Sequence, residues 1–156
     1  MCIRDRLETA RGLESRAKAA GVRLELPVDH IVAPKLEAGA PTQILEVTNE
    51  DIGDRMGLDI GPKTAANYRD VIATAKTVVW NGPMGVFEID AFAAGTIAVA
   101  QAVAAVSGTT IIGGGDSVAA VARAGVADKM THISTGGGAS LEFLAGRDLP
   151  GVVALQ

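Results

Sequence analysis

Two stretches of the chain, TTIIGGGDSVAAV (Thr109–Val121) and HISTGGGASLEF (His132–Phe143), share one pattern. In each, a short apolar run leads into three consecutive glycines and then into small residues with helical spacing. Glycine loses more backbone freedom on folding than any other residue, so these junctions are costly unless something is gained. A strand that enters a helix through glycines leaves backbone N–H groups bare at the positive end of the helix dipole, where phosphate binds. Two tight turns would also account for the glycines, so both interpretations stay open here.

The order of strand-like and helix-like runs predicts an α/β fold. Strands are predicted over Thr77–Asn81, Thr109–Ile112 and His132–Ser134, and helices over Leu7–Ala20, Pro62–Ala75, Asp90–Val106, Ser117–Ala124 and from Gly138 onward. Such alternation is typical of a doubly wound, Rossmann-like parallel sheet with helices on both faces. Ligands of these folds bind at the carboxyl ends of the strands, and both glycine triplets follow strand ends.

The amino-terminal third is less regular. Arg23–Val28 (RLELPV) alternates polar and apolar residues and is predicted to be a strand. From His30 to Met56 the pattern is weak, which indicates a surface excursion with a short strand at Gln43–Val47 (QILEV).

Composition narrows the function classes. The chain has 156 residues, enough for one domain, of which 48% are hydrophobic and only 3% aromatic. A net charge of −4 argues against nucleic acid as a partner. Cys2 is the only cysteine, which excludes disulfides within the chain and favours a reducing compartment. The apolar run Thr96–Ile112 is interrupted by Gln101, Ser107 and Gly108, so we do not expect a membrane span, and the charged start MCIRDRLETAR does not match a secretory signal.

Two common nucleotide motifs are missing from the sequence. The dinucleotide pattern G-x-G-x-x-G fails in both triplets because Val118 and Leu141 occupy its last position. No G-x-x-x-x-G-K-[ST] P-loop occurs anywhere in the chain. An unrelated oxidoreductase or flavoprotein is therefore disfavoured.

A third strand end, VVWNGPMGVFE (Val78–Glu88), identifies a family. Together with GGGDSVAAV and HISTGGGASLEFL it resembles the carboxyl-terminal nucleotide domain of the phosphoglycerate kinase family, in the same order. The resemblance runs from about Leu7 to the last residue, so we interpret residues 7–156 as part of that domain and residues 1–6 as a non-native leader. Further matching segments are LPVD (Leu26–Asp29), MGLDIGPKT (Met56–Thr64) and LPGVVAL (Leu149–Leu155).

The resemblance implies a cytoplasmic glycolytic phosphotransferase. Such an enzyme interconverts 1,3-bisphosphoglycerate plus ADP and 3-phosphoglycerate plus ATP with Mg²⁺, and its full-length form is expected to be a monomer. The amino-terminal domain that grips 3-phosphoglycerate is missing from this chain, as are the lysine-bearing loop and glycine-rich wall of the nucleotide site. We therefore expect the isolated chain to be inactive. The alternative is a short protein that binds Mg-nucleotide without catalysis.

The resemblance also assigns roles to individual residues. Gly114 and Gly115 would approach the nucleotide phosphates, Asp116 would hold Mg²⁺, and Ser117 would add a hydroxyl. The second triplet would direct backbone N–H groups at the transferred phosphoryl group, Asn81 would lie near the phosphates and Glu88 would bond the ribose hydroxyls. From the residues alone, Asp116 and Ser117 could instead cap a helix, and Glu88 could be a solvated carboxylate. The residues of the second triplet are Gly136, Gly137 and Gly138.

Overall fold

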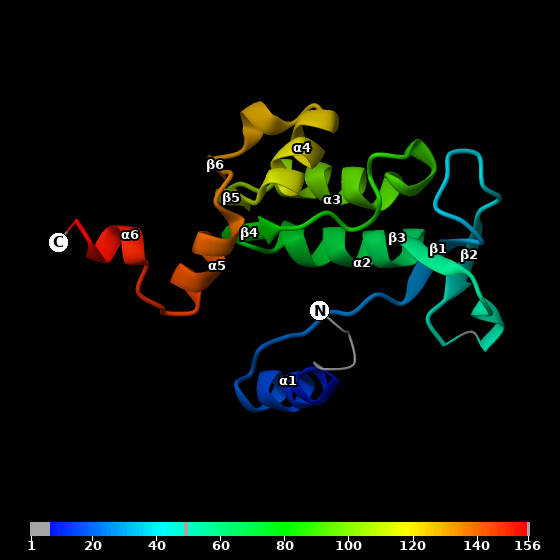
Figure 1. Cartoon of the computed structure of the whole chain (residues 1–156), viewed down its shortest axis with the longest axis horizontal. Helices are drawn as coiled ribbons and strands as arrows, with labels where there is room; N and C mark the ends of the chain where they lie inside the picture. The colour runs from blue at the N-terminus through cyan, green and yellow to red at the C-terminus, as the bar shows by residue number, and fades with distance from the viewer. Residues whose placement is uncertain (1–6, 49, 156) are drawn as a thin grey trace.

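The computed structural model describes residues 7–48 and 50–155. The interpretation of residues 1–6 as a leader therefore lies outside the described residues. The helices are α1 (Leu7–Ala19), α2 (Pro62–Ala73), α3 (Ala94–Ala104), α4 (Gly115–Arg123), α5 (Gly137–Leu144) and α6 (Pro150–Val153) (Figure 1). The strands are β1 (Asp29–Ala33), β2 (Gln43–Glu46), β3 (Met56–Ile60), β4 (Thr77–Asn81), β5 (Thr109–Gly113) and β6 (His132–Ser134). Single 3₁₀ turns span Glu50–Ile52, Asp90–Phe92 and Ala127–Lys129.

The carboxyl-terminal half contains the predicted parallel sheet. Its strands run in the order β4-β5-β6, and both pairs are parallel. Asn81 pairs with Gly113, and Gly113 pairs with Ser134, so the three strands end at the same level. The predicted α/β class and the three predicted strands are confirmed.

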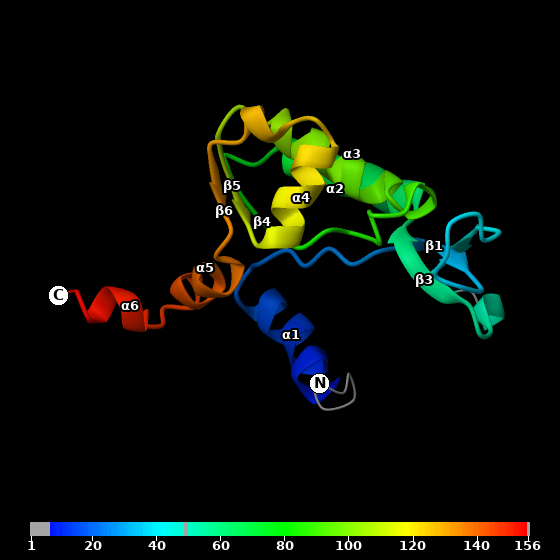
Figure 2. The same cartoon turned by 45° about the horizontal axis from the view of Figure 1, so that its top comes forward.

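Helices lie on both faces of this sheet. On one face, Trp80 and Ile112 are buried against the apolar sides of α2, α3 and α4. On the other face, Val79 and Ile111 line an apolar groove with α5, including Phe143. Figure 2 shows α3 and α4 on one side of the strands and α5 leading away from their ends. In the described part of the chain no helix is long and apolar enough to span a bilayer.

A second, antiparallel sheet was not predicted. Its order is β2-β1-β3, and both neighbours of β1 run antiparallel to it. The short strand expected at QILEV is confirmed as β2, whereas no strand was predicted at β3. This sheet occupies the opposite end of the molecule from α5 and α6 (Figure 1).

The predicted strand at Arg23–Val28 is wrong. The backbone runs extended there, but the strand begins only at Asp29. Among the described residues, no strand pairs with residues 22–27, so the expected hydrogen-bond ladder does not form. Alternate apolar side chains remain exposed along it, with fractional exposures of 60% for Val22, 48% for Leu24 and 64% for Leu26.

Two buried carboxylates connect the antiparallel sheet to helix starts. Asp29 accepts hydrogen bonds from the backbone N–H groups of Lys63 (3.0 Å) and Thr64 (2.8 Å) and from the Thr64 hydroxyl (2.6 Å). Burial acts to raise the pKa of Asp29, but these hydrogen bonds outweigh it and lower the pKa below its usual value. Asp29 therefore stays ionised and stabilises the first turn of α2.

Asp59 accepts hydrogen bonds at the start of the next helix, α3. Its carboxylate accepts hydrogen bonds from the N–H groups of Gly95 (2.7 Å) and Ile60 (2.9 Å), and burial raises its pKa. The continuous helix predicted over Asp90–Val106 is therefore wrong at its start: a 3₁₀ turn ends at Phe92, and α3 begins anew at Ala94. The cap comes from a residue far away in sequence, which local spacing cannot reveal.

Candidate functional site

The site forms where β4, β5 and β6 end. Gly114 follows β5 with φ of +90°, a conformation that side chains rarely adopt, and α4 begins at the next residue. Its N–H donates to the carbonyl of Ser134 at the end of β6, at 3.0 Å. The first glycine triplet is thus tied to the strand that carries the second.

The two triplets and Asn81 converge at one point. A Cβ placed on Gly137 would lie 2.7 Å from the amide oxygen of Asn81 and 2.8 Å from the Cα of Gly114. A Cβ on Gly114 would lie 3.0 Å from the same Asn81 oxygen. Glycine is therefore required at this contact by close packing. By contrast, a Cβ on Gly115 or Gly138 would meet nothing within 4 Å, so the space beside these two residues is open.

The first turn of α4 carries the predicted phosphate and metal residues. Gly115 and Asp116 are exposed there, whereas Ser117 is only 1% exposed. The Ser117 hydroxyl oxygen accepts a hydrogen bond from the backbone N–H of Gly82 at 2.6 Å. Helix α4 begins after Gly114 without a side-chain cap, so neither Asp116 nor Ser117 serves as its capping residue.

Helix α5 starts in a similar way. Gly136 is its N-terminal flanking residue, and again no side chain caps the helix. The N–H of Gly136 donates to the hydroxyl of Ser134 at 3.2 Å, and the hydroxyl of Ser140 donates to the carbonyl of Gly136 at 2.9 Å. Both helices therefore present first turns whose backbone N–H groups have no carbonyl partner within the helix.

The loop from Gly82 to Glu88 is held by residues that sequence reasoning missed. The Thr96 hydroxyl accepts hydrogen bonds from the N–H groups of Met84 (3.1 Å) and Gly85 (3.2 Å). Glu88 is exposed, and its carbonyl accepts a hydrogen bond from Arg123 at 3.2 Å. Arg123 also pairs with Asp90. No local pattern marks these anchors, because each is separated from the loop it holds by many residues.

Metal binding would involve a single protein carboxylate. Within residues 7–48 and 50–155 no group of three or more His, Cys, Asp or Glu side chains is placed to hold a metal ion. Mg²⁺ usually takes one or two carboxylates and fills its other positions with water and substrate phosphates. The exposed carboxylate of Asp116 beside the open first turn of α4 fits that pattern, while His30 and His132 contribute to no such group.

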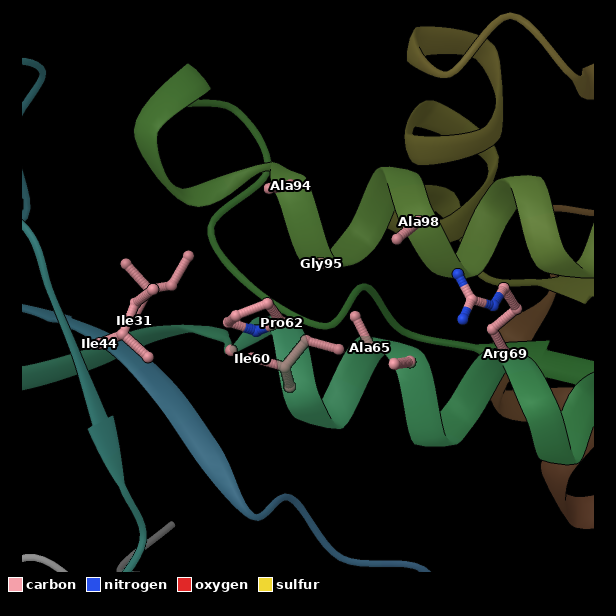
Figure 3. A pocket seen from close by; sticks show the side chains of 11 residues that line it. Ile31, Ile44, Ile60, Pro62, Ala65, Arg69, Ala94, Gly95 and Ala98 are labelled. Atoms are coloured by element: carbon pink, nitrogen blue, oxygen red, sulfur yellow. The ribbon is translucent and has the colours of Figure 1, made fainter.

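An apolar pocket of about 380 Å³ lies elsewhere, between the antiparallel sheet and helices α2 and α3. Figure 3 shows Pro62 and Ala65 from α2 facing Gly95 and Ala98 from α3, with Arg69 at one end. None of the predicted site residues lines it. The pocket is therefore separate from the convergence of the glycine triplets.

Comparison with known proteins decides the family. The family model described as phosphoglycerate kinase matches residues 1–147. The chain belongs to the phosphoglycerate kinase family. The phosphoglycerate kinase of Clostridium novyi is 61% identical over 152 residues, which cover 97% of this chain and 38% of the relative. That of Chlorobium luteolum is 61% identical over 155 residues, which cover 97% of this chain and 39% of the relative.

Solved phosphoglycerate kinases share the fold. The structure from Coxiella burnetii matches with a TM-score of 0.91 and 42% identity, covering 99% of this chain and 40% of that chain. The structure from Pyrococcus horikoshii matches with a TM-score of 0.73 and 36% identity, covering 95% of this chain and 38% of that chain. The resemblance found in the motifs is confirmed, and the chain spans about two fifths of the length of the phosphoglycerate kinases it matches.

Proposed function

We propose that this chain forms the nucleotide side of a phosphoglycerate kinase that interconverts 1,3-bisphosphoglycerate plus ADP and 3-phosphoglycerate plus ATP. An oxygen of the ADP β-phosphate bonds to the transferred phosphorus while the bond from phosphorus to the acyl oxygen breaks, which releases a carboxylate. The observation that carries the proposal is the meeting of Asn81, Gly114 and Gly137 at the ends of parallel strands in a chain of this family. Such chemistry depends mainly on positioning and charge stabilisation.

The first turn of α4 is the proposed phosphate site. Gly114 and Gly115 would approach the nucleotide phosphates here, where the helix dipole favours anions. The Gly114 N–H already donates to the Ser134 carbonyl, so the N–H of the exposed Gly115 is the one that would meet phosphate. Asp116 would hold Mg²⁺ together with phosphate oxygens, and the bound ion would neutralise charge on those phosphates. Asn81 would bind near the phosphates.

Glu88 is proposed to bond the ribose hydroxyls. Its backbone is held by Arg123 in the last turn of α4, whereas Asp116 lies in the first turn. The two ends are about 10 Å apart along the helix axis. The proposed ribose and phosphate contacts are thus made at opposite ends of one helix.

The start of α5 is the proposed contact for the transferred phosphoryl group. The triplet Gly136, Gly137 and Gly138 would direct N–H groups at its oxygens, as backbone donors do for a developing oxyanion. The Gly136 N–H already donates to the Ser134 hydroxyl, so Gly137 and Gly138 would supply the donors. The open space beside Gly138 supports this role, because a phosphoryl group must approach the backbone there.

The rest of the enzyme would supply the second substrate. We propose that 3-phosphoglycerate binds to an amino-terminal domain present in the longer relatives, and that the complete enzyme is a monomer working in cytoplasmic glycolysis. This chain alone should show no turnover in a coupled assay, since the reactants must be enclosed between two domains. Turnover above background would contradict that expectation.

Calorimetric titration with Mg-ADP tests the nucleotide site directly. We expect saturable binding, which Asp116→Asn weakens about tenfold in the presence of Mg²⁺ and changes little for metal-free ADP. Asp128→Asn, which changes an exposed aspartate in a 3₁₀ turn, is the matched control and should leave binding unchanged. No saturable binding at about 1 mM Mg-ADP would refute the proposal.

A non-catalytic Mg-nucleotide-binding protein is the second candidate, because the residues that converge in the candidate site are those proposed to contact the nucleotide and the transferred group. Mixing the chain with the amino-terminal part of the relative from Clostridium novyi distinguishes the two. Recovered phosphoryl transfer would support the kinase, whereas Mg-ADP binding without transfer would support the second candidate.

A further inference from the structure

Both backbone polar groups of Gly82, its N–H and its carbonyl, are hydrogen-bonded to buried side chains. The indole N–H of Trp80 donates to the Gly82 carbonyl at 2.6 Å, and the Gly82 N–H donates to the Ser117 hydroxyl oxygen at 2.6 Å. Trp80 is 6% exposed and Ser117 is 1% exposed. Gly82 itself has φ of +107°. We call this arrangement of Trp80, Gly82 and Ser117 the Gly82 clamp.

The clamp acts next to Asn81. Asn81 is the last residue of β4 and precedes Gly82, and its amide oxygen lies where Gly114 and Gly137 meet. Ser117 stands in the first turn of α4, three residues after Gly114. The hydrogen bond from Gly82 to Ser117 therefore fixes the end of β4 relative to the start of α4, and both contribute to the candidate site.

The Ser117 hydroxyl is poorly placed to touch a ligand. A residue that is 1% exposed offers almost no surface to a nucleotide, and its oxygen already accepts the Gly82 N–H. Removing the hydroxyl would leave that N–H without its acceptor, and a buried unpaired N–H is costly enough to move a turn. Asn81 would then lose its fixed position.

We infer that the Ser117 hydroxyl is a positioning group: through the Gly82 clamp it orients Asn81 toward the nucleotide phosphates instead of binding them itself. This inference rests on the proposed function for the ligand, while the clamp can be measured without any ligand. Asn81, which contacts the ligand in the proposal, is the residue that the clamp serves.

Ser117→Ala removes the hydroxyl, and Ser117→Thr keeps it. Thr110→Val is the matched control, because it also removes a buried hydroxyl. The Thr110 hydroxyl accepts a hydrogen bond from the backbone N–H of Thr131 at 3.0 Å, and Thr110 lies three residues before the end of β5. Two quantities are measured for each variant of the full chain: amide exchange of Gly82 by NMR, and the dissociation constant for Mg-ADP by calorimetry.

For Ser117→Ala we expect Gly82 exchange to accelerate at least about tenfold and Mg-ADP to bind about tenfold more weakly. Ser117→Thr should stay within about threefold of the unmodified chain in both, and Thr110→Val should leave both unchanged. Weaker binding with unchanged Gly82 exchange would overturn the inference, because the hydroxyl would then act on the nucleotide directly. Faster exchange with unchanged binding would also overturn it. If the unmodified chain bound no Mg-ADP, the proposed function would fail, while Gly82 exchange would still accept or reject the clamp.

Discussion

Replacing Gly137 by alanine tests whether the two glycine triplets are in contact. The added Cβ would lie 2.8 Å from the Cα of Gly114, 3.0 Å from its nitrogen and 2.7 Å from the Asn81 amide oxygen. Carbon atoms pack at about 3.5 Å or more, so the methyl group is about 0.7 Å too close to backbone that cannot rotate away. The starts of α4 and α5 would have to separate.

Overpacking of this kind costs about 1–3 kcal/mol. Alanine favours a helix over glycine by up to about 1 kcal/mol, but Gly137 is the first residue of α5, where that gain is smallest. We therefore expect Gly137→Ala to lower the free energy of unfolding by about 1–2 kcal/mol. Urea denaturation followed by the fluorescence of Trp80, the only tryptophan, measures it.

Gly138→Ala is the matched control on the next residue. Its Cβ would meet nothing within 4 Å, and its φ is not positive, so the substitution should be neutral or stabilise the fold by up to about 1 kcal/mol. Equal unfolding free energies for the two variants, within about 0.5 kcal/mol, would refute the close contact between the triplets.

Two further predictions concern the buried link between β1 and α2. Thr64→Val removes an acceptor for the backbone N–H groups of Val28 (3.0 Å) and Asp29 (3.1 Å). In urea denaturation it should lower the free energy of unfolding by about 2–4 kcal/mol. The control Thr74→Val changes an exposed threonine and should alter the free energy of unfolding by less than about 0.5 kcal/mol. The pKa of Asp29 is lowered from 3.8, so its contribution to stability is present above that value and is lost as the pH falls through the folded pKa. Denaturation of the chain and of Asp29→Asn from about pH 2 to pH 7 should give a difference in unfolding free energy that shrinks toward acid; a difference that stays constant would contradict the assignment. Asp59, with its raised pKa, has the opposite dependence, but its contribution is common to both proteins and cancels in the difference.

The parallel sheet and its glycine junctions could be predicted because their signals are local. The strands Thr77–Asn81 and Thr109–Gly113 contain short apolar runs, and each glycine triplet marks its own strand end. Their convergence on Asn81 follows from parallel pairing, which places successive carboxyl ends side by side.

The wrong and missed predictions concern features whose structure depends on residues far away in the sequence. Arg23–Val28 has the alternation of a strand, but in the described part of the chain no strand lies beside it to supply hydrogen bonds. The helix predicted from Asp90 begins only at Ala94, and its first turn is bound by Asp59, which is far away in the sequence. The Gly82 clamp was missed for the same reason: Ser117 is 35 residues from its partner.

The same extended stretch also determines how the chain should respond to proteases. Proteolytic sites bind substrates as exposed, extended backbone, and residues 22–27 provide this between α1 and β1 with exposed leucines at Leu24 and Leu26. A cut there would release α1 while leaving both sheets and the glycine junctions in one piece, because none of their strands includes those residues. Limited digestion is thus a direct way to isolate the part of the chain that carries the candidate site.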